Sequence, residues 1–223
     1  MASRRIDAIP VMRPALPKAD RIRPHIDRID ENRWYTNHGP LLKKLETEIG
    51  AHFGLDRENV VTVCNGTIAL AIALRCKTAQ QGYCLLPSWT FVGCAHAVNL
   101  SGLTPFLCDV SRETGTLTTK EATAALAKCP KPAPALIPVN LFGEPDSVEE
   151  WEMFKRGTGV KVVLECAGGF DTFHPSSSLR MISLHATRLF SVGEGALLIT
   201  RGDELADRVR RAINFGFSLD RVS

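Results

Sequence analysis

The segment VVTVCNGTIALAIALRC, residues 60–76, decides the fold of this 223-residue chain. It begins with a short run of β-branched and apolar residues (60–64), which is typical of a buried strand. An Asn-Gly pair then turns the chain, and a stretch rich in alanine, leucine and isoleucine (67–76) predicts a helix. A strand that turns directly into a helix is the unit from which α/β folds are built.

The same alternation of apolar runs and helical stretches continues along the chain. Continuous runs of valine, isoleucine and leucine indicate strands buried on both sides, and intervening helices predict an α/β fold, a mostly parallel sheet with crossover helices on both faces. Gly54 and Ser147 are the expected caps of two helices. The further strands are expected at 83–87, 104–110, 134–140, 160–167, 179–185 and 196–200. The helices are expected at 18–31, 41–54, 67–76, 91–102, 119–129, 147–159 and 202–216.

Composition excludes several classes of function. A hydrophobic fraction of 44% and a charged fraction of 23% are those of a globular protein, and 223 residues suffice for one large domain. A formal net charge of +3, with scattered basic residues, does not indicate a nucleic-acid partner. The sequence shows no signal-peptide pattern and no apolar run of membrane-spanning length, so a cytoplasmic protein without a membrane partner is expected.

The seven cysteines are odd in number, and none has the CxxC spacing. Most lie in apolar runs, where a thiol behaves as a small hydrophobic side chain. Reduced cysteines are therefore expected, with neither a disulfide framework nor a metal site.

Ligands of open α/β sheets bind beyond the carboxyl ends of the strands, so the loops after the strands are where a site is expected. Gly66, Thr67 and Ile68 open the helix after the first strand, where free backbone amides and the helix dipole favour a phosphate. The alternative is a plain strand-to-helix turn capped by Thr67. In the next such loop, the rings of Trp89 and Phe91 either stack on a flat ligand or pack between helix and sheet.

Two further loops carry charged and polar side chains. Glu165 ends a predicted strand, where a carboxylate either has a positive or hydrogen-bonding partner or marks a solvated strand end. The stretch SLHATRLFSVGEGALLIT, residues 183–200, brings Ser183, His185 and Arg188 to another strand end. A single histidine such as His185 is more often structural than catalytic.

These loops, in this order, resemble the DegT/DnrJ/EryC1/StrS family of sugar aminotransferases that use pyridoxal 5'-phosphate (PLP). The likeness is to members that aminate the 4-keto carbon of nucleotide-linked 4-keto-6-deoxyhexoses. The matching stretches are IPVMRPALP, RWYTNHGPLLKKLE, NGTIALAIAL, LLPSWTFVGCAHAV, GLTPFLCDV, VNLFGEP, VKVVLECA, SLHATRLFSVGEGALLIT and NFGF. The resemblance implies the large domain of a type I aminotransferase, PLP as cofactor, a nucleotide-sugar and an amino donor as substrates, and a role in polysaccharide or O-antigen biosynthesis.

The resemblance also implies roles for single residues. The backbone of Gly66, Thr67 and Ile68 matches the turn that holds the cofactor phosphate. Ser183 matches a serine that reaches the same phosphate, and Phe91 matches the aromatic ring that stacks on the pyridine ring.

It further implies a domain organisation and a homodimer. Residues 1–40 would form an N-terminal arm, a helix and a loop at the mouth of the active site, and 41–223 the PLP-binding large domain. Two subunits usually share each active site in this family. Family members continue past the NFGF segment into a small C-terminal domain, whereas this chain stops at Ser223. A truncated large domain is therefore expected, with apolar surface left for a partner or dimer mate.

Three residues depart from the family pattern. Glu165 stands where the family has the aspartate that pairs with the pyridine nitrogen, and Gly168 stands where a histidine or glutamine contacts the cofactor. Arg188 stands where the family has the lysine that forms the Schiff base. That lysine must become neutral to react, which arginine does not do. PLP is therefore expected to be non-covalently held if it binds at all, and normal transamination to be impaired.

Three hypotheses of function stay open, and with them whether the protein is an enzyme. It is a residual sugar-aminotransferase-like enzyme, a non-catalytic protein that binds PLP or a nucleotide-sugar beside an active homologue, or a decaying gene product. In the second, a bidentate Arg188–Glu165 pair would explain both substitutions together.

Overall fold

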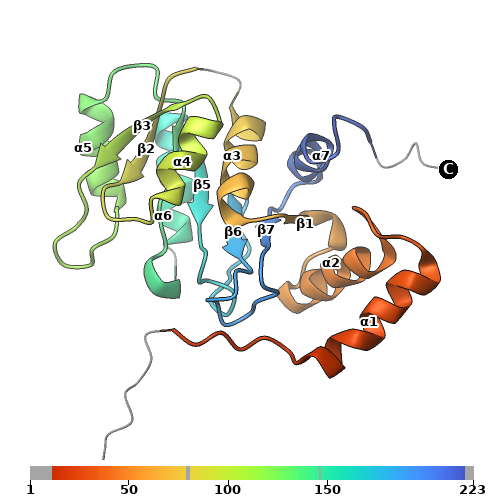
Figure 1. The fold of residues 1–223 in the computed structure, drawn as a ribbon. Helices are drawn as coiled ribbons and strands as arrows, with labels where there is room; N and C mark the ends of the chain where they lie inside the picture. Colours follow the sequence, from red (N-terminus) through yellow and green to blue (C-terminus); the bar gives the residue numbers. More distant parts are fainter. Residues whose placement is uncertain (1–11, 79–80, 146, 219–223) are drawn as a thin grey trace, which may run out of the picture.

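Seven strands form one sheet within residues 12–78, 81–145 and 147–218, which are the residues described by the structure, a computed structural model (Figure 1). The strand order is β1-β7-β6-β5-β4-β2-β3. The strands are β1 Val60–Val63, β2 Tyr83–Pro87, β3 Thr104–Cys108, β4 Ala135–Leu136, β5 Lys161–Glu165, β6 Leu179–Ser183 and β7 Ala196–Ile199. All neighbours from β3 to β6 pair in parallel, which confirms the expected α/β fold with a mostly parallel sheet.

Strand β7 runs against all the others, because it pairs antiparallel with both β6 and β1. Parallel neighbours need a long crossover, whereas antiparallel strands can be joined by a loop. The segment 184–195 between β6 and β7 contains turns and bridges but no helix. The loop after β6 therefore folds back on itself at the edge where the parallel strands end.

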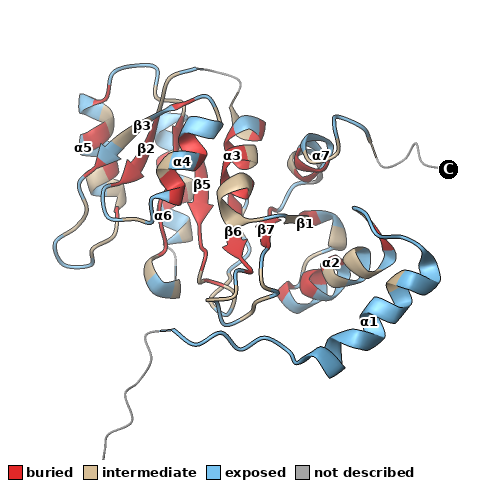
Figure 2. Ribbon diagram, viewed as in Figure 1, coloured by how far each residue is buried: buried red, intermediate tan, exposed pale blue. Residues whose placement is uncertain are grey.

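Helices cover both faces of the sheet, as predicted. They are α1 Ala19–Asn32, α2 Pro40–Phe53, α3 Gly66–Lys77, α4 Gly93–Leu100, α5 Thr119–Lys128, α6 Val148–Thr158 and α7 Asp203–Ala212, with short 3-10 helices η1 Arg57–Asn59 and η2 Leu141–Gly143. One core cluster joins the sheet to α3, α4 and α7, and a second joins the opposite face to α2, α5 and α6. Figure 1 shows α3 and α4 in front of the strands, and Figure 2 shows the strands buried between the two layers.

Helix α1 forms where the period of Ile22, Ile26 and Ile29 predicted it, but it buries none of its residues (Figure 2). Ile22 and Ile26 are 40% and 51% exposed. The division of the chain at residue 40 stays a prediction, and the arm before residue 12 lies outside the described residues.

Strand β4 is shorter than the expected 134–140, because Pro134 and Pro138 lack the backbone N–H that a ladder needs. Pairing with β5 resumes beyond the strand: the Glu165 amide donates to the Pro138 carbonyl at 3.0 Å, and the Asn140 amide donates to the Glu165 carbonyl at 2.8 Å. These bonds place Asn140 beside the carboxyl end of β5.

A buried ion pair joins α7 to α2, and hydrogen bonds from the same arginine reach η1 and β1. Arg210 is 7% exposed and Glu46 3%, and the Arg210 Nη1 atom lies 3.6 Å from Glu46 Oε2. Arg210 Nη2 also donates to the carbonyl oxygens of Arg57, Glu58 and Val60 at 2.9, 3.3 and 2.7 Å. Burial lowers the pKa of the Arg210 guanidinium, and the charge of Glu46 opposes that effect. The pair therefore holds a charged arginine inside the fold.

Three helix ends differ in how they are capped. Gly54 takes the left-handed conformation expected of a C-cap, with φ of 66°. At the start of α3 the cap is Asn65, not Thr67, because Asn65 Oδ1 accepts from the Ile68 amide at 2.9 Å. Ser147 precedes α6 as expected, but its side chain makes no cap hydrogen bond to any residue that the structure describes.

This difference predicts unequal effects of removing the two side chains. Asn65→Ala is expected to lower the free energy of unfolding by about 1 kcal/mol, since it deletes a cap bond. Ser147→Ala, the matched control, is expected to change it by less than about 0.5 kcal/mol. Urea denaturation of both variants measures the difference, and equal losses would contradict the assignment of the caps.

Candidate functional site

The first turn of α3 presents backbone amides at the carboxyl edge of the parallel strands. The Ile68 amide is occupied by the Asn65 side chain. The amides of Gly66 and Thr67 belong to the first turn, whose N–H groups have no acceptor within the helix, and the positive end of the helix dipole lies there. This turn can therefore bind an anion.

Ser183 lies beside this turn, at the end of β6. A Cβ atom added to Gly66 would lie 3.1 Å from Met181 Sδ and 4.0 Å from Ser183 Cβ, so a larger residue at 66 would push α3 away from β6. Ser183 is 9% exposed, and its Oγ atom accepts from the His185 amide at 3.2 Å. The hydroxyl group of Ser183 can rotate, so its hydrogen can be donated to an acceptor that lies near it.

The aromatic rings of the loop after β2 stay outside the core. Phe91 is 76% exposed and Trp89 61%, so neither packs between helix and sheet. A Cβ atom added to Gly93 would lie 2.8 Å from the Phe91 ring and 3.0 Å from Thr67 Oγ1. The Phe91 ring therefore stands next to the first turn of α3, where it can stack on a flat ligand.

Glu165 is buried at the end of β5, at 7% exposure, and is not a solvated strand end. The Ala167 amide donates to its Oε1 atom at 3.2 Å, and the Ser183 amide donates to the Ala167 carbonyl at 3.3 Å. Burial, and then the charge of Glu165, raise the pKa of the Cys94 thiol to about 12. A fixed carboxylate thus lies between the β6 end and α4.

Gly168 packs tightly against the loop after β4. A Cβ atom added to Gly168 would lie 3.2 Å from the Gly143 amide nitrogen, and one added to Gly143 would lie 2.6 Å from the Gly168 carbonyl oxygen. The side chain of a histidine or glutamine at 168 would need this loop to move. The absence of a side chain at Gly168 therefore permits the close contact with Gly143.

Asn140 is a candidate site residue that the sequence did not single out. It is 8% exposed, its buried Oδ1 atom has no hydrogen-bond partner among the described residues, and its backbone bonds to Glu165. A buried polar atom without a partner is costly and is often satisfied by a ligand or water. Its place in the VNLFGEP motif was the signal that could have found it.

Arg188 lies in the loop between β6 and β7, with its side chain exposed. Its amide donates to the His185 carbonyl at 2.9 Å, which closes the turn. Within the described residues, no carboxylate lies within ion-pair distance of its guanidinium, so the Arg188–Glu165 pair is not formed. Glu165 ends a buried strand, whereas Arg188 stands on the outside of its turn.

The neighbouring His185 has partners within its own loop. Its Nδ1 atom lies 2.9 Å from Thr187 Oγ1, and its Nε2 atom 3.5 Å from Glu194 Oε1. Both side chains of the His185–Glu194 pair are largely exposed. These contacts support the structural role expected of a single histidine.

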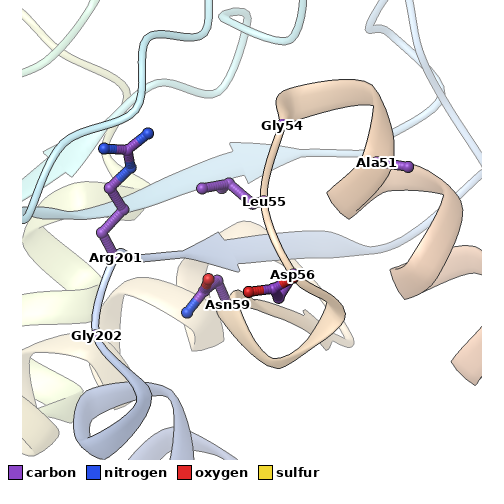
Figure 3. A pocket seen from close by; sticks show the side chains of 7 residues that line it. All are labelled: Ala51, Gly54, Leu55, Asp56, Asn59, Arg201 and Gly202. Atoms are coloured by element: carbon purple, nitrogen blue, oxygen red, sulfur yellow. The ribbon is translucent and has the colours of Figure 1, made fainter.

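Two pockets lie away from these residues. One, of about 410 Å³, opens between the turn after α2 and the segment after β7 (Figure 3). A second, of about 160 Å³, lies between α1 and the loop 34–40. Across the described parts of the chain, no helix is long and apolar enough to cross a membrane. The same residues contain no group of three metal-ligating side chains.

Comparison with known proteins finds one family. A model of the DegT/DnrJ/EryC1/StrS aminotransferase family matches residues 18–222. Protein Rv3402c of Mycobacterium tuberculosis (strain ATCC 25618 / H37Rv) is 29% identical over 233 aligned positions, which cover 98% of this chain and 55% of that protein. The dTDP-4-amino-4,6-dideoxy-D-glucose transaminase of Shigella dysenteriae is 28% identical over 213 positions, covering 93% of this chain and 56% of that enzyme.

A solved structure from Bacillus cereus ATCC 10987, assigned to the PLP-dependent aminotransferases, superposes with a TM-score of 0.86 at 29% identity. The superposition covers 96% of this chain and 60% of that one. The chain therefore spans little more than half the length of the proteins it matches. The part of the solved structure that superposes on this chain corresponds to the sheet and helices described above.

Proposed function

Because the chain belongs to the DegT/DnrJ/EryC1/StrS aminotransferase family, we propose that it binds PLP non-covalently and does not perform the family's lysine-dependent amino transfer. One observation carries this proposal. The turn that can hold a phosphate is complete, whereas the position expected for the reactive lysine bears Arg188, an exposed guanidinium without a described ion-pair partner.

The residues present fit the binding of PLP. Gly66 approaches β6 closely, so that the first turn of α3 lies at the end of that strand. Within the described parts of the chain, the buried Oδ1 atom of Asn140 lacks a hydrogen-bond partner, and a ligand can supply one. The amides of Gly66 and Thr67 would bind the phosphate, together with the Ser183 hydroxyl. The exposed ring of Phe91 would lie against the pyridine ring.

Glu165 would hold a proton on the pyridine nitrogen. When bound, PLP supplies an electron-withdrawing ring that stabilises negative charge on a substrate carbon. The Ala167 amide fixes the direction of the Glu165 carboxylate. Glutamate is one methylene longer than aspartate, so this carboxylate reaches further from its strand. We expect that extra length to alter the tilt of the ring and not the charge opposite its nitrogen.

Arg188 would lack the chemistry of a lysine at its position. A nucleophilic amine must lose its proton, and the guanidinium of arginine stays protonated at all physiological pH values. Arg188 would instead present a fixed positive charge at the mouth of the site. The protein would therefore retain PLP, or a nucleotide-sugar of the class named for the Shigella relative, without turning it over.

The proposed homodimer is supported by exposed apolar side chains in the loops after β2, β4 and β6. Trp89, Phe142 and Leu189 are 61%, 93% and 85% exposed, and these loops all follow parallel strands at the same edge of the sheet, where a second subunit could cover them. Sedimentation velocity tests the proposal: a species of twice the chain mass is expected, and a monomer at micromolar concentration would refute it.

Equilibrium dialysis against PLP tests the binding proposal. We expect saturable binding of one PLP per chain that is lost on further dialysis. Phe91→Ala is expected to weaken it about threefold to tenfold, since a stacked ring contributes roughly 0.5–1.5 kcal/mol. Phe217→Ala, which truncates another exposed aromatic (68% exposed) that is not among the proposed cofactor contacts, is the matched control and is expected to bind as the unmodified protein does. Absence of saturable binding would refute the proposal.

A further inference from the structure

Three aromatic rings form a stacked column beside the candidate site. Phe190, in the loop between β6 and β7, stacks on Phe170, with ring centroids 4.3 Å apart and an angle of 17° between the ring planes. Phe170 stacks in turn on His52 of α2, with centroids 5.4 Å apart and an angle of 16°. The column therefore reaches from the loop that carries Arg188 to the end of α2.

Phe190 joins its loop to the rest of the fold. A backbone bond within the loop connects two of its own residues, because the Ala186 amide donates to the Gly193 carbonyl at 2.8 Å. The adjacent side chain of Leu189 is 85% exposed, whereas Phe190 is half-buried and packs against the core cluster on the α2 side of the sheet. The stack on Phe170 thus sets where the tip of the loop lies.

Phe170 is itself anchored in the core. Its ring centroid lies 5.0 Å from that of Phe53, which is 9% exposed, and the Phe53 centroid lies 4.2 Å from that of Phe173. The Arg180 guanidinium, in β6, lies 5.3 Å from the centre of the Phe173 ring. Phe170 also follows Gly168 by two residues, so the stack joins the loop after β5 to the loop after β6.

We propose that Phe190 is a positioning residue of the candidate site, because its stack on Phe170 fixes the loop after β6 before a ligand binds. This inference rests on the proposed binding of PLP. Ser183 directly precedes the loop, and its Oγ atom accepts from the His185 amide within the loop at 3.2 Å. A loop held in place therefore also holds the Ser183 hydroxyl and the exposed Arg188 in a defined arrangement.

The expected benefit is pre-organisation of the site. Ordering a loop during binding reduces affinity, so a loop that is ordered beforehand leaves more of the binding free energy to the ligand. A stacked aromatic pair shifts an equilibrium by roughly threefold to tenfold beyond the effect of its buried area. Leucine keeps the apolar character of phenylalanine without the ring, whereas tyrosine keeps the ring. Replacing Phe190 by each of them therefore separates stacking from hydrophobic burial.

Limited proteolysis with trypsin measures how firmly the loop is held. Cleavage after Arg188 requires the loop to open, because a protease binds an extended and unpacked segment. We expect Phe190→Leu to be cleaved there about threefold to tenfold faster than the unmodified protein, and Phe190→Tyr at the unmodified rate. Mass spectrometry of the fragments identifies this cut. Phe217→Leu, at a ring that is 68% exposed and outside the column, is the matched control and should also be cleaved at the unmodified rate.

Equilibrium dialysis of the same variants against PLP completes the test. We expect the dissociation constant for PLP to rise about threefold to tenfold in Phe190→Leu and to stay unchanged in Phe190→Tyr and Phe217→Leu. Equal cleavage of Phe190→Leu and the unmodified protein would overturn the inference. Faster cleavage with the same PLP affinity in all variants would overturn it alone, whereas an unmodified protein that binds no PLP would overturn the proposed function as well.

Discussion

Replacing Arg188 by lysine is expected to turn reversible binding of PLP into covalent attachment that borohydride makes permanent. The unmodified protein should gain no mass after incubation with PLP and reduction at that position, whereas most of the Arg188→Lys protein should gain one reduced cofactor. The physical reason is that lysine supplies an amine that can lose its proton, which a guanidinium does not. Intact mass spectrometry measures the fraction modified.

The second substitution tests the role proposed for Glu165. Adding Glu165→Asp to Arg188→Lys shortens the carboxylate by one methylene at an unchanged charge. If the two positions act on one bound cofactor, the double variant should attach PLP more completely than the single one at limiting cofactor. Peptide mapping must then locate the label at residue 188.

A matched control separates a specific site from a general increase in lysine content. Arg201 is also exposed, but it lies beside the pocket at the opposite edge of the sheet (Figure 3). Arg201→Lys should therefore remain unmodified at that residue. An Arg188→Lys protein that still binds PLP in dialysis but stays unlabelled would show that residue 188 is not at the reactive position.

Removing the Glu46 carboxylate is expected to lower the free energy of unfolding by about 3–5 kcal/mol. Glu46→Gln leaves the Arg210 guanidinium inside the fold without its counter-charge, and it also changes the acceptor used by the Thr62 amide and hydroxyl at 3.1 and 3.0 Å. An uncompensated buried charge costs far more than the lost pair itself contributes. Urea denaturation, followed by far-UV circular dichroism, measures the change.

The chain offers a control on the same helix. Glu48 forms an exposed ion pair with Lys44 at 3.6 Å, with side chains 65% and 57% accessible. Glu48→Gln is therefore expected to cost less than about 0.5 kcal/mol. Adding Arg210→Met to Glu46→Gln should recover part of the loss, because the unpaired charge is removed. Similar losses in Glu46→Gln and Glu48→Gln would contradict the role of the buried pair.

Much of the fold could be predicted because its strands and helices depend on patterns within short stretches of sequence. The strands coincide with apolar runs and the helices with helical periods. The left-handed conformation of Gly54 was predictable because glycine is the residue that most readily adopts it at a helix end. The two caps show the limit of such patterns. Asn65 and Thr67 are both good capping residues, and only the turn after β1 decides that Asn65 points back to the Ile68 amide.

The rest could not be predicted because it depends on contacts between distant parts of the chain. Glu46 and Arg210 lie on helices at opposite ends of the sequence, and no local period relates them. The contact of Gly168 with Gly143 likewise needs the β4 and β5 ends to be side by side. Asn140 lies in a motif that the resemblance had matched, but its burial beside Glu165 appears only when the strands are paired.

The position of β1 also matters while the chain is being made. This strand forms an edge of the sheet, and its only sheet partner within the described residues is β7, whose residue Ile199 pairs with Val60. A ribosome adds about 5–20 residues per second, so the VVTV strand emerges on the order of ten seconds before its partner. During that interval its backbone N–H and C=O groups and its valines are open to other nascent chains. Early synthesis of the strand that opens the fold therefore creates a period in which the unfinished chain is exposed to misassociation.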